Sequence, residues 1–276
     1  MRKNVLFRIY ILVISGLIIM TGCVEEPDGS FSTHEPIFAD DPPSRPDPKP
    51  EPKPEPDPSG TIIVSIRNAS NGSTRVTPDI CHSYFGISNA NNFIGYADDW
   101  KFSTAGITDG LGSIKKIPTA GWASQVSVMP GYGYVGASFS GVFGGRLQTA
   151  NVIYVRLYVD NYIKNTSGGV MGAYVKYQSP FSAIPDAREI TLSASTVNLS
   201  NQGGGWAQDQ ITVSPHNANW SVTSNANWFG VGTFDVNAFK IYYDQNLTNA
   251  PRSATITVKV EGLRDKTITV TQSGQK

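Results

Sequence analysis

Residues 152–159, VIYVRLYV, are the stretch that decides the fold class of this chain. Its odd-numbered positions are apolar, and its even-numbered positions include Tyr154, Arg156 and Tyr158. A period of two residues is typical of a strand with one buried face. The turn-forming residues 165–169, NTSGG, then lead into a second β-rich stretch at 170–178. We therefore predict a β-hairpin with Tyr154, Arg156 and Tyr158 on its outward face.

The same composition extends over the rest of the chain from residue 60, where β-branched and aromatic residues mix with Gly, Asn, Ser and Thr. In the first part we expect strands at 61–67, 122–129, 133–139, 152–162 and 170–178. A boundary near 182–186 is followed by eight short strands, at 189–193, 196–199, 210–213, 220–223, 228–231, 240–243, 254–260 and 266–272. The sequence thus predicts an all-β chain, with a β-rich domain at 60–183 and an immunoglobulin-like β-sandwich at 187–276.

The first 22 residues have the pattern of a signal peptide. Basic residues precede a short apolar run at 9–20, which ends before small residues. A transmembrane helix needs about 20 apolar residues, more than this run supplies. The following residues, Met20-Thr21-Gly22-Cys23, resemble the lipobox of bacterial lipoproteins, in which the cysteine is acylated and becomes the N-terminus. The resemblance implies a lipid on Cys23 that holds the chain to a membrane. The alternative is an ordinary signal peptide with a chance cysteine.

Residues 23–59 are predicted to form an acidic, Pro-rich stalk. The acidic stretch 24–28 resembles the signal that exports lipoproteins of Bacteroidetes to the cell surface, so the expected location is the outer face of the outer membrane. Residues 25–41 have no periodicity and are expected to be disordered. Residues 42–58, PPSRPDPKPEPKPEPDP, exclude helix and central strand, and at about 3.1 Å per residue they span roughly 50 Å.

The charge, cysteine and histidine content argue against a nucleic-acid partner, stabilising disulfides, a structural metal and a cofactor. Loss of residues 1–22 removes three of the 22 basic residues and leaves 19 against 22 acidic ones, a formal charge of about −3. No nucleic-acid partner is therefore expected. Acylation of Cys23 leaves Cys81 as a lone thiol, so disulfides do not hold the protein together. His34, His82 and His216 are scattered, and we expect neither a structural metal nor a cofactor.

The C-terminal part, residues 189–274, carries a distinctive set of landmarks. They are LSAS at 192–195, GGG at 203–205, WSV at 220–222, WFGV at 228–231, RSATITV at 252–258 and ITVTQSG at 268–274. Together they resemble the BACON module, named as Bacteroidetes-associated, carbohydrate-binding and often N-terminal. The resemblance implies an immunoglobulin-like fold and carbohydrate binding. Its C-terminal position departs from the family pattern and argues against an appendage to a glycosidase.

The first β-rich segment is similar to an uncharacterised domain family of lipoproteins from the same bacteria. The similarity rests on KKIPTAGWA at 115–123 and PGYGY at 130–134, and it supplies no activity.

Aromatic residues are the candidates for glycan binding, because sugars stack their apolar C–H face on aromatic rings. Trp206 follows three glycines and is either an open platform or a side chain folded back on the sandwich. Trp220 and Trp228 lie in alternating strands and are expected in the core. The remaining candidates, which alternatively form cross-strand pairs, are Trp100, Trp122, Tyr132, Tyr134, Tyr154, Arg156 and Tyr158. The expected partner is a polysaccharide or a mucin-type glycan.

No catalytic residue is predicted. Asp98 and Asp99 are adjacent; on a strand their carboxylates would point to opposite faces, whereas in a loop they could converge. Cys81 and His82 would likewise point apart, and no G-x-S-x-G motif occurs. Two functions stay open: a non-catalytic surface lipoprotein that binds glycans, and a structural or adhesive protein with a BACON-like spacer and a protein-binding first domain. A hydrolase would need carboxylates that converge in a cleft.

Overall fold

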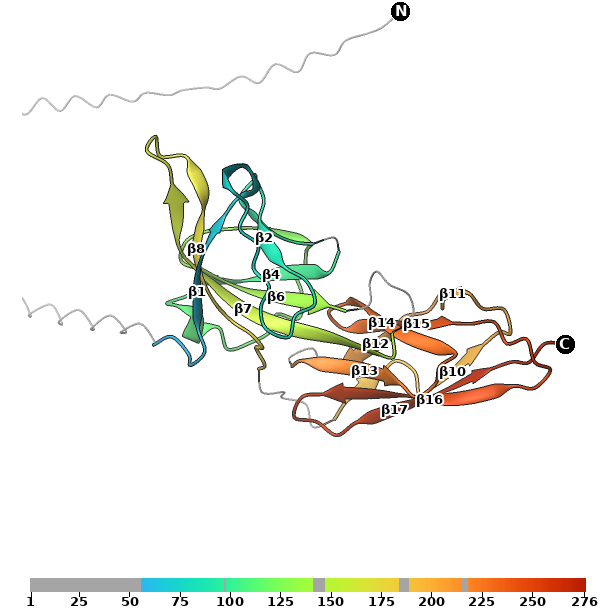
Figure 1. The fold of residues 1–276 in the computed structure, drawn as a ribbon. Coiled ribbons are helices and arrows are strands. Elements are labelled where there is room, and N and C mark those ends of the chain that lie inside the picture. The colour runs from blue at the N-terminus through green and yellow to red at the C-terminus, as the bar shows by residue number, and fades with distance from the viewer. Residues whose placement is uncertain (1–55, 97, 141–146, 184–188, 215–217) are drawn as a thin grey trace, which may run out of the picture. The chain divides into compact units, whose positions relative to one another are not determined.

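The structure is a computed structural model that describes residues 56–96, 98–140, 147–183, 189–214 and 218–276 (Figure 1). These residues form strands and two single-turn 3₁₀ helices, η1 at Ala69–Asn71 and η2 at Leu111–Ser113. The prediction of an all-β chain is confirmed. The predicted signal peptide, Cys23 and residues 24–55 of the stalk lie outside the described residues. Within the described residues, no helix is long and apolar enough to cross a membrane.

The first segment is built on an antiparallel sheet whose strands follow the order β1, β8, β7, β6, β4. Their bounds are β1 Ile62–Arg67, β8 Val170–Gln178, β7 Thr149–Lys164, β6 Tyr132–Phe139 and β4 Trp100–Ile107. A smaller sheet of β2 Phe85–Ile87, β3 Asn92–Gly95 and β5 Gln125–Ser127 packs on it. The two sheets bury a shared aromatic core, in which Phe85 and Phe93 meet Trp100, Phe102 and Tyr134.

The long strand β7 carries the main sheet from the first segment into the second (Figure 1). Residues Thr149 to Val152 at its start pair antiparallel with β13, Trp220–Ser224. The sheet then continues through β16 Arg252–Val260, β17 Lys266–Gln272 and β10 Thr196–Leu199, the last of which runs parallel to β17. The predicted segments 60–183 and 187–276 therefore contribute strands to one hydrogen-bonded sheet.

A second sheet of short strands closes the C-terminal sandwich. It contains β9 Thr191–Leu192, β11 Gly205–Trp206, β12 Ile211–Ser214, β14 Phe229–Asp235 and β15 Ala238–Tyr243. Its inward residues, such as Val231 and Ile241, pack with Val222, Val258 and Val270 of the main sheet. The same cluster includes Phe139, Val152 and Tyr154 of the first segment, so the core is continuous across the two segments.

The hairpin predicted from residues 152–178 is present as β7 and β8, with one difference. Tyr154 is fully buried, although strand alternation places it on the outward face. Its ring lies 6.0 Å from that of Trp122, and it belongs to the same buried cluster as Trp220. Both faces of β7 are therefore covered at this position, because parts of the chain distant in sequence pack on the face expected to meet solvent.

The last residues of the predicted stalk contact the sheet. Asp57 pairs with Lys176 of β8 at 2.8 Å, and the Ser59 carbonyl accepts a hydrogen bond from Gln178 Nε2 at 2.8 Å. Pro58 O accepts hydrogen bonds from the backbone and hydroxyl of Thr61. The chain thus enters β1 from a point fixed on β8.

Candidate functional site

The local backbone around Trp206 is shaped by the run Gly203-Gly204-Gly205. A Cβ on Gly203 would lie 2.1 Å from the carbonyl carbon of Asp244, so only glycine lets the two backbones approach this closely. Gly204 has φ +91° and donates its N–H to Tyr243 O at 2.7 Å. Ala207 N–H donates to Ile241 O at 2.7 Å. These contacts fix the short strand β11 against β15 and so position Trp206.

Trp206 stands between two other aromatic rings. Its ring centroid lies 4.7 Å from that of Phe234 and 5.3 Å from that of Tyr242, and both pairs are edge-to-face. Trp206 and Tyr242 are direct cross-strand partners. All three side chains are half-buried, and we call them the Trp206 cluster. The cluster offers partly exposed aromatic surface that the packing of three rings holds in place.

The Trp206 cluster lies on the outer face of the second sheet. Phe239 and Ile241 of β15 are buried in the sandwich core, so Lys240 and Tyr242 point to the opposite face. Lys240 is half-buried, and Gln208 and Asp209, which follow β11, are exposed. Aromatic rings beside polar side chains are the combination that sugar ligands require, because stacking and hydrogen bonding then act together.

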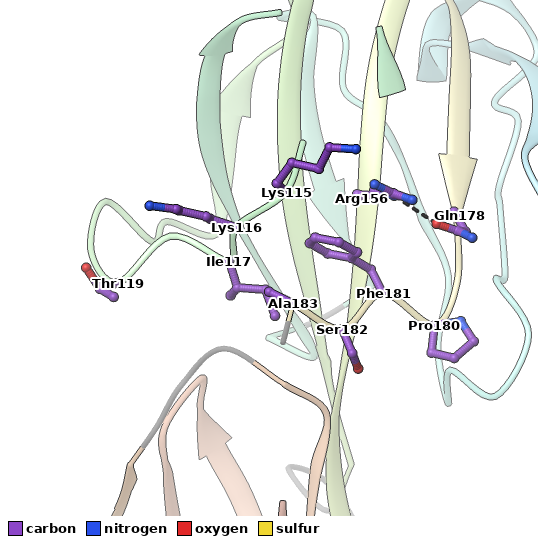
Figure 2. Close-up of a pocket in the computed structure, with 10 residues that line it drawn as sticks. All are labelled: Lys115, Lys116, Ile117, Thr119, Arg156, Gln178, Pro180, Phe181, Ser182 and Ala183. Atoms are coloured by element: carbon purple, nitrogen blue, oxygen red, sulfur yellow. Dashed lines mark hydrogen bonds between the residues drawn. The ribbon is translucent and has the colours of Figure 1, made fainter. Parts of the chain in front are cut away.

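A second concave feature lies in the first segment, and Figure 2 shows the side chains that line it. Its volume is about 780 Å³. The described lining residues include three cationic side chains and no carboxylate. We call this feature the basic pocket, and its lining residues are Lys115, Lys116, Ile117, Thr119, Arg156, Gln178, Pro180, Phe181, Ser182 and Ala183.

Arg156 of the basic pocket contacts several neighbouring groups. Its Nε donates to Gln178 Oε1 at 2.8 Å, and its Nη1 donates to Ile114 O at 2.9 Å. The guanidinium carbon lies 4.9 Å from the centroid of the Phe181 ring. In Figure 2 the Lys115 side chain extends toward Arg156, whereas Lys116 points the other way. The guanidinium is thus held at the wall of the pocket by neighbours on three sides.

Two of the predicted glycan-binding residues lie in the core of the first segment. Trp100 stacks on Phe102 at 5.7 Å and is 1% exposed. Tyr134 is fully buried, its hydroxyl donates to Ser127 O at 2.8 Å, and it accepts from Met129 N–H at 2.9 Å. Burial raises the pKa of Tyr134 to about 12. In this conformation neither ring has a face open to a ligand.

The other predicted residues of the first segment are dispersed. Trp122 is half-buried and donates its indole N–H to Pro118 O at 2.9 Å. Tyr158 is half-buried against the sandwich core cluster, and Tyr132 is half-buried against the core of the first segment. Tyr154 is buried. Arg156 lies in the basic pocket, and Trp206 lies in its own cluster. The predicted glycan-binding residues therefore do not form one continuous row.

The two tryptophans expected in the core lie at different depths. Trp220 is 3% exposed and belongs to the core cluster. Trp228 is half-buried, and Arg252 covers it, with the guanidinium carbon 4.5 Å from the ring centroid. Arg252 is held by Gln272 Oε1 at 2.8 Å and by Asp244 O at 3.0 Å. Trp228 is thus capped by its own chain.

Among the titratable groups considered for catalysis, Asp98 and His82 both lie near Asp99. Asp98 is exposed, and burial raises the pKa of its half-buried neighbour Asp99. Burial raises the pKa of Cys81 to about 11, and its Sγ lies 3.9 Å from Ser179 Oγ. His82 Nε2 hydrogen-bonds Asn151 Oδ1 at 3.1 Å. No three His, Cys, Asp or Glu side chains gather as a metal site within the described residues.

Strand alternation in the sequence identifies some of the site residues that were not predicted, but not all of them. In β15 the sequence AFKIYY alternates, and this pattern places Tyr242 opposite the buried Ile241. Phe234 sits at an irregularity in the pairing of β14 with β15, between Thr233 and Asp235, where alternation breaks down. Phe181 follows the end of β8 and meets Arg156 only in the folded chain.

Comparison with known proteins supports the resemblance of the C-terminal part to the BACON module. No curated protein matches the chain. The model of the BACON family, described as "Putative binding domain, N-terminal", matches residues 218–273. The matched residues run from β13 through β17 and include Phe234 and Tyr242 of the Trp206 cluster, while Trp206 itself precedes them. The chain therefore carries a BACON domain near its C-terminus.

Proposed function

We propose that this chain is a non-catalytic surface protein that captures carbohydrate by aromatic stacking at the Trp206 cluster. The observation that carries the proposal is the partly exposed indole of Trp206, held edge-to-face between Phe234 and Tyr242, which lie within the residues matched by the BACON model. Sugars stack their C–H face on such rings, and the polar side chains beside them bind hydroxyl groups.

The N-terminal sequence supports a place at the cell surface for this activity. A lipid on Cys23 anchors the chain to the outer membrane, and the Pro-rich stalk at 42–58 holds the binding domain away from the lipid surface. The attachment of Asp57 to Lys176 gives the stalk a fixed junction with the folded part. A lipid anchor, a stalk and an aromatic binding surface are sufficient to capture a polysaccharide or a mucin-type glycan.

A glycan array with the purified full-length chain tests the proposal. Trp206→Ala should weaken glycan binding about tenfold or more, because one central aromatic side chain carries a large share of such binding energy. Tyr174→Ala is the matched control, since Tyr174 is 44% exposed on β8 and lies outside the cluster. Circular dichroism checks that each variant is folded. Equal binding by wild type and Trp206→Ala, or no bound glycan, would refute the site.

The absence of catalysis is tested on the same ligands. Glycans that bind should be recovered at unchanged mass after long incubation with the chain. A shorter product that the buffer alone does not give would contradict the non-catalytic role.

A structural or adhesive role is the second candidate, and the joined sheet favours it. The pairing of β7 with β13 and the continuous core would make the BACON-like segment a stiff spacer that holds the first segment in place. In that case the first segment would bind a protein partner. A well-folded chain that binds no glycan on the array would favour this role over carbohydrate capture.

A further inference from the structure

We propose that the open edge of β1 pairs with β1 of a second copy of this chain, so that the main sheets of two molecules join into one. This edge ends the main sheet in the first segment, and the Trp206 cluster lies on a different sheet. The proposal rests on the unpaired backbone groups of the edge, on its apolar side chains and on the symmetry of the stretch that is open.

The backbone of β1 alternates between its neighbour β8 and the open edge. The N–H of Asn68, just after the strand, donates to the backbone of β8 at 2.9 Å, so residue 68 faces β8. Arg67 faces the other way, because its N–H donates to Thr74 Oγ1 at 3.2 Å and its carbonyl accepts from the Thr74 N–H at 3.1 Å. The pairing of β1 with β8 has no register shift. By alternation, the N–H and C=O groups of Ile63 and Ser65 therefore point to the open edge.

Both ends of this open stretch are closed by the chain itself. The outward groups of Arg67 are already bonded, and the Thr61 N–H is bonded within the turn before the strand. Among the described residues, the N–H and C=O groups of Ile63 and Ser65 have no hydrogen-bond partner on this edge. The open donors and acceptors are thus placed symmetrically about Val64.

A second copy supplies the complement of this stretch. In an antiparallel pair centred on Val64, Ile63 of one chain lies opposite Ser65 of the other, and the two residues exchange both of their hydrogen bonds. The two-fold axis repeats the exchange, so every open N–H and C=O group of the stretch finds a partner. The same surface thus serves both chains, as a two-fold interface requires.

The side chains of β1 do not protect the edge against such pairing. Exposed edge strands are commonly protected by a charge, a proline, a bulge or a short length. Residues 62–66, IIVSI, contain neither charge nor proline and pair with β8 without a bulge, and Ile62 and Ile63 are 42% and 68% exposed. The other two edge strands of the main sheet differ, because Phe102 of β4 bonds Ala123 on its outer side and β10 is only four residues long. Of the three edges, β1 is therefore the one most open to pairing.

The predicted stalks allow two anchored chains to pair on one membrane. The two Thr61 residues of the pair lie about 20 Å apart, because six residues separate them along the joined strands and each adds about 3.4 Å. A stalk of roughly 50 Å, predicted from residues 42–58, is longer than this separation. The pairing itself does not require the proposed anchor, which only raises the local concentration. Two copies joined in this way carry two Trp206 clusters, and a glycan with repeated units would engage both.

Sedimentation of the full-length chain over a wide range of concentrations tests the proposal. The chain should pass from monomer to dimer as its concentration rises. Ser65→Pro removes an outward N–H that the pairing with β8 does not use, and it should weaken dimerisation by about tenfold or more while the chain stays folded. Ile63→Lys should have a similar effect, because a lysine on an edge strand opposes pairing. Ile107→Lys is the matched control, since Ile107 is 78% exposed on β4, and it should leave dimerisation unchanged. Circular dichroism checks that each variant is folded.

Cysteine cross-linking tests the register of the pair. Val64→Cys places two thiols opposite each other at the two-fold axis, with Cα atoms about 4.5 Å apart, which a disulfide can span. Ile62→Cys lies on the same face of the strand, but its two copies are about 14 Å apart in this register. After mild oxidation, Val64→Cys should give a disulfide-linked dimer and Ile62→Cys no more than wild type, although Ile62 is the more exposed of the two. Wild type carries Cys23 and Cys81 and so measures the background.

Three results would overturn the proposal. They are a chain that stays monomeric at every concentration, dimerisation that Ser65→Pro and Ile63→Lys leave unchanged, and cross-linking of Ile62→Cys as efficient as that of Val64→Cys. Slow amide exchange of residues 63 and 65 in the monomer would equally overturn it, because another segment of the same chain would then cover the edge. Glycan binding through Trp206 is measured separately and does not need the dimer, so the two proposals fail independently.

Discussion

The Tyr154 hydroxyl and the Trp220 indole N–H donate to the same acceptor, the carbonyl oxygen of Val236, at 2.9 and 3.0 Å. Tyr154 lies on β7 and Trp220 on β13, the two strands that join the segments. The shared acceptor adds a buried polar contact to the strand pairing. It fixes both aromatic rings against the second sheet of the sandwich.

Tyr154→Phe should lower the free energy of unfolding by about 1–2 kcal/mol, because a buried hydrogen bond to Val236 O is lost. Trp220 still donates to the same oxygen, so the carbonyl is not left unpaired. Tyr158→Phe is the matched control on the same strand, since its hydroxyl bonds no described residue. Urea unfolding followed by circular dichroism measures both. An equal cost for the two variants would contradict a structural role of the Tyr154 hydroxyl.

The continuous sheet predicts that the two segments unfold together. Val222→Ala, a truncation in the buried part of β13, should cost about 1–3 kcal/mol. Because β13 pairs with β7, amide exchange should accelerate in β8 of the first segment as well as in β17. Hydrogen exchange with mass spectrometry resolves the two strands. Acceleration confined to β17 would mean that the segments unfold independently.

Two glycines of the run before Trp206 should differ in how much their substitution by alanine destabilises the chain. Gly203→Ala should destabilise the chain by about 2–3 kcal/mol, because the new Cβ would meet the Asp244 backbone at 2.1 Å. Gly205→Ala meets nothing within 4 Å and should stay within about 0.5 kcal/mol of wild type. Thermal unfolding compares the two. If Gly203→Ala were as stable as Gly205→Ala, the close approach of the two backbones would be wrong.

Much of the fold follows from alternation alone, and the exceptions have local causes. The predicted strands at 170–178, 196–199 and 266–272 coincide with β8, β10 and β17. β4 was not predicted, because its pairing with β6 is irregular between Thr104 and Gly106 and the two-residue period breaks there. β2, β3 and β11 are two to four residues long, too short to show a period.

The candidate sites depend on contacts between residues that are far apart in the sequence, and local sequence patterns do not predict such contacts. Alternation identified Tyr154 as a strand residue, but which faces of β7 are covered depends on Trp122 and Trp220, which lie far away in the chain. Trp206 was expected as a platform or as a folded-back side chain, and it combines both, packed on Phe234 and Tyr242 yet half-exposed. The basic pocket joins a loop, a strand and the segment after β8.

The environment of Cys81 predicts slow alkylation. Burial raises the pKa of this thiol from 9.0 to about 11, so less reactive thiolate is present at pH 8. Iodoacetamide should modify Cys81 more than tenfold more slowly in the folded chain than in urea. Mass spectrometry of the Cys81 peptide gives both rates. Equal rates in the folded and unfolded chain would show that the thiol is accessible and ionises normally.

Tyr134 predicts a loss of stability at alkaline pH. Burial raises its pKa from 10.0 to about 12, because the fold binds the neutral phenol better than the phenolate. The unfolded chain therefore loses this proton first. The contribution of Tyr134 is fully present below pH 10 and is lost as the pH rises toward 12. Its donation to Ser127 O requires the neutral phenol, whereas the Met129 N–H also bonds the phenolate and opposes part of the shift.

Tyr134→Phe separates this effect from the titration of other tyrosines. At pH 7 the variant should be less stable by about 1–2 kcal/mol, because the Met129 N–H and the Ser127 carbonyl lose their partner. Between pH 10 and 12 the wild type should lose stability faster than the variant, so the difference between them narrows. Urea unfolding at a series of pH values measures this difference. A constant difference up to pH 12 would mean that Tyr134 ionises as readily in the folded chain as in the unfolded one.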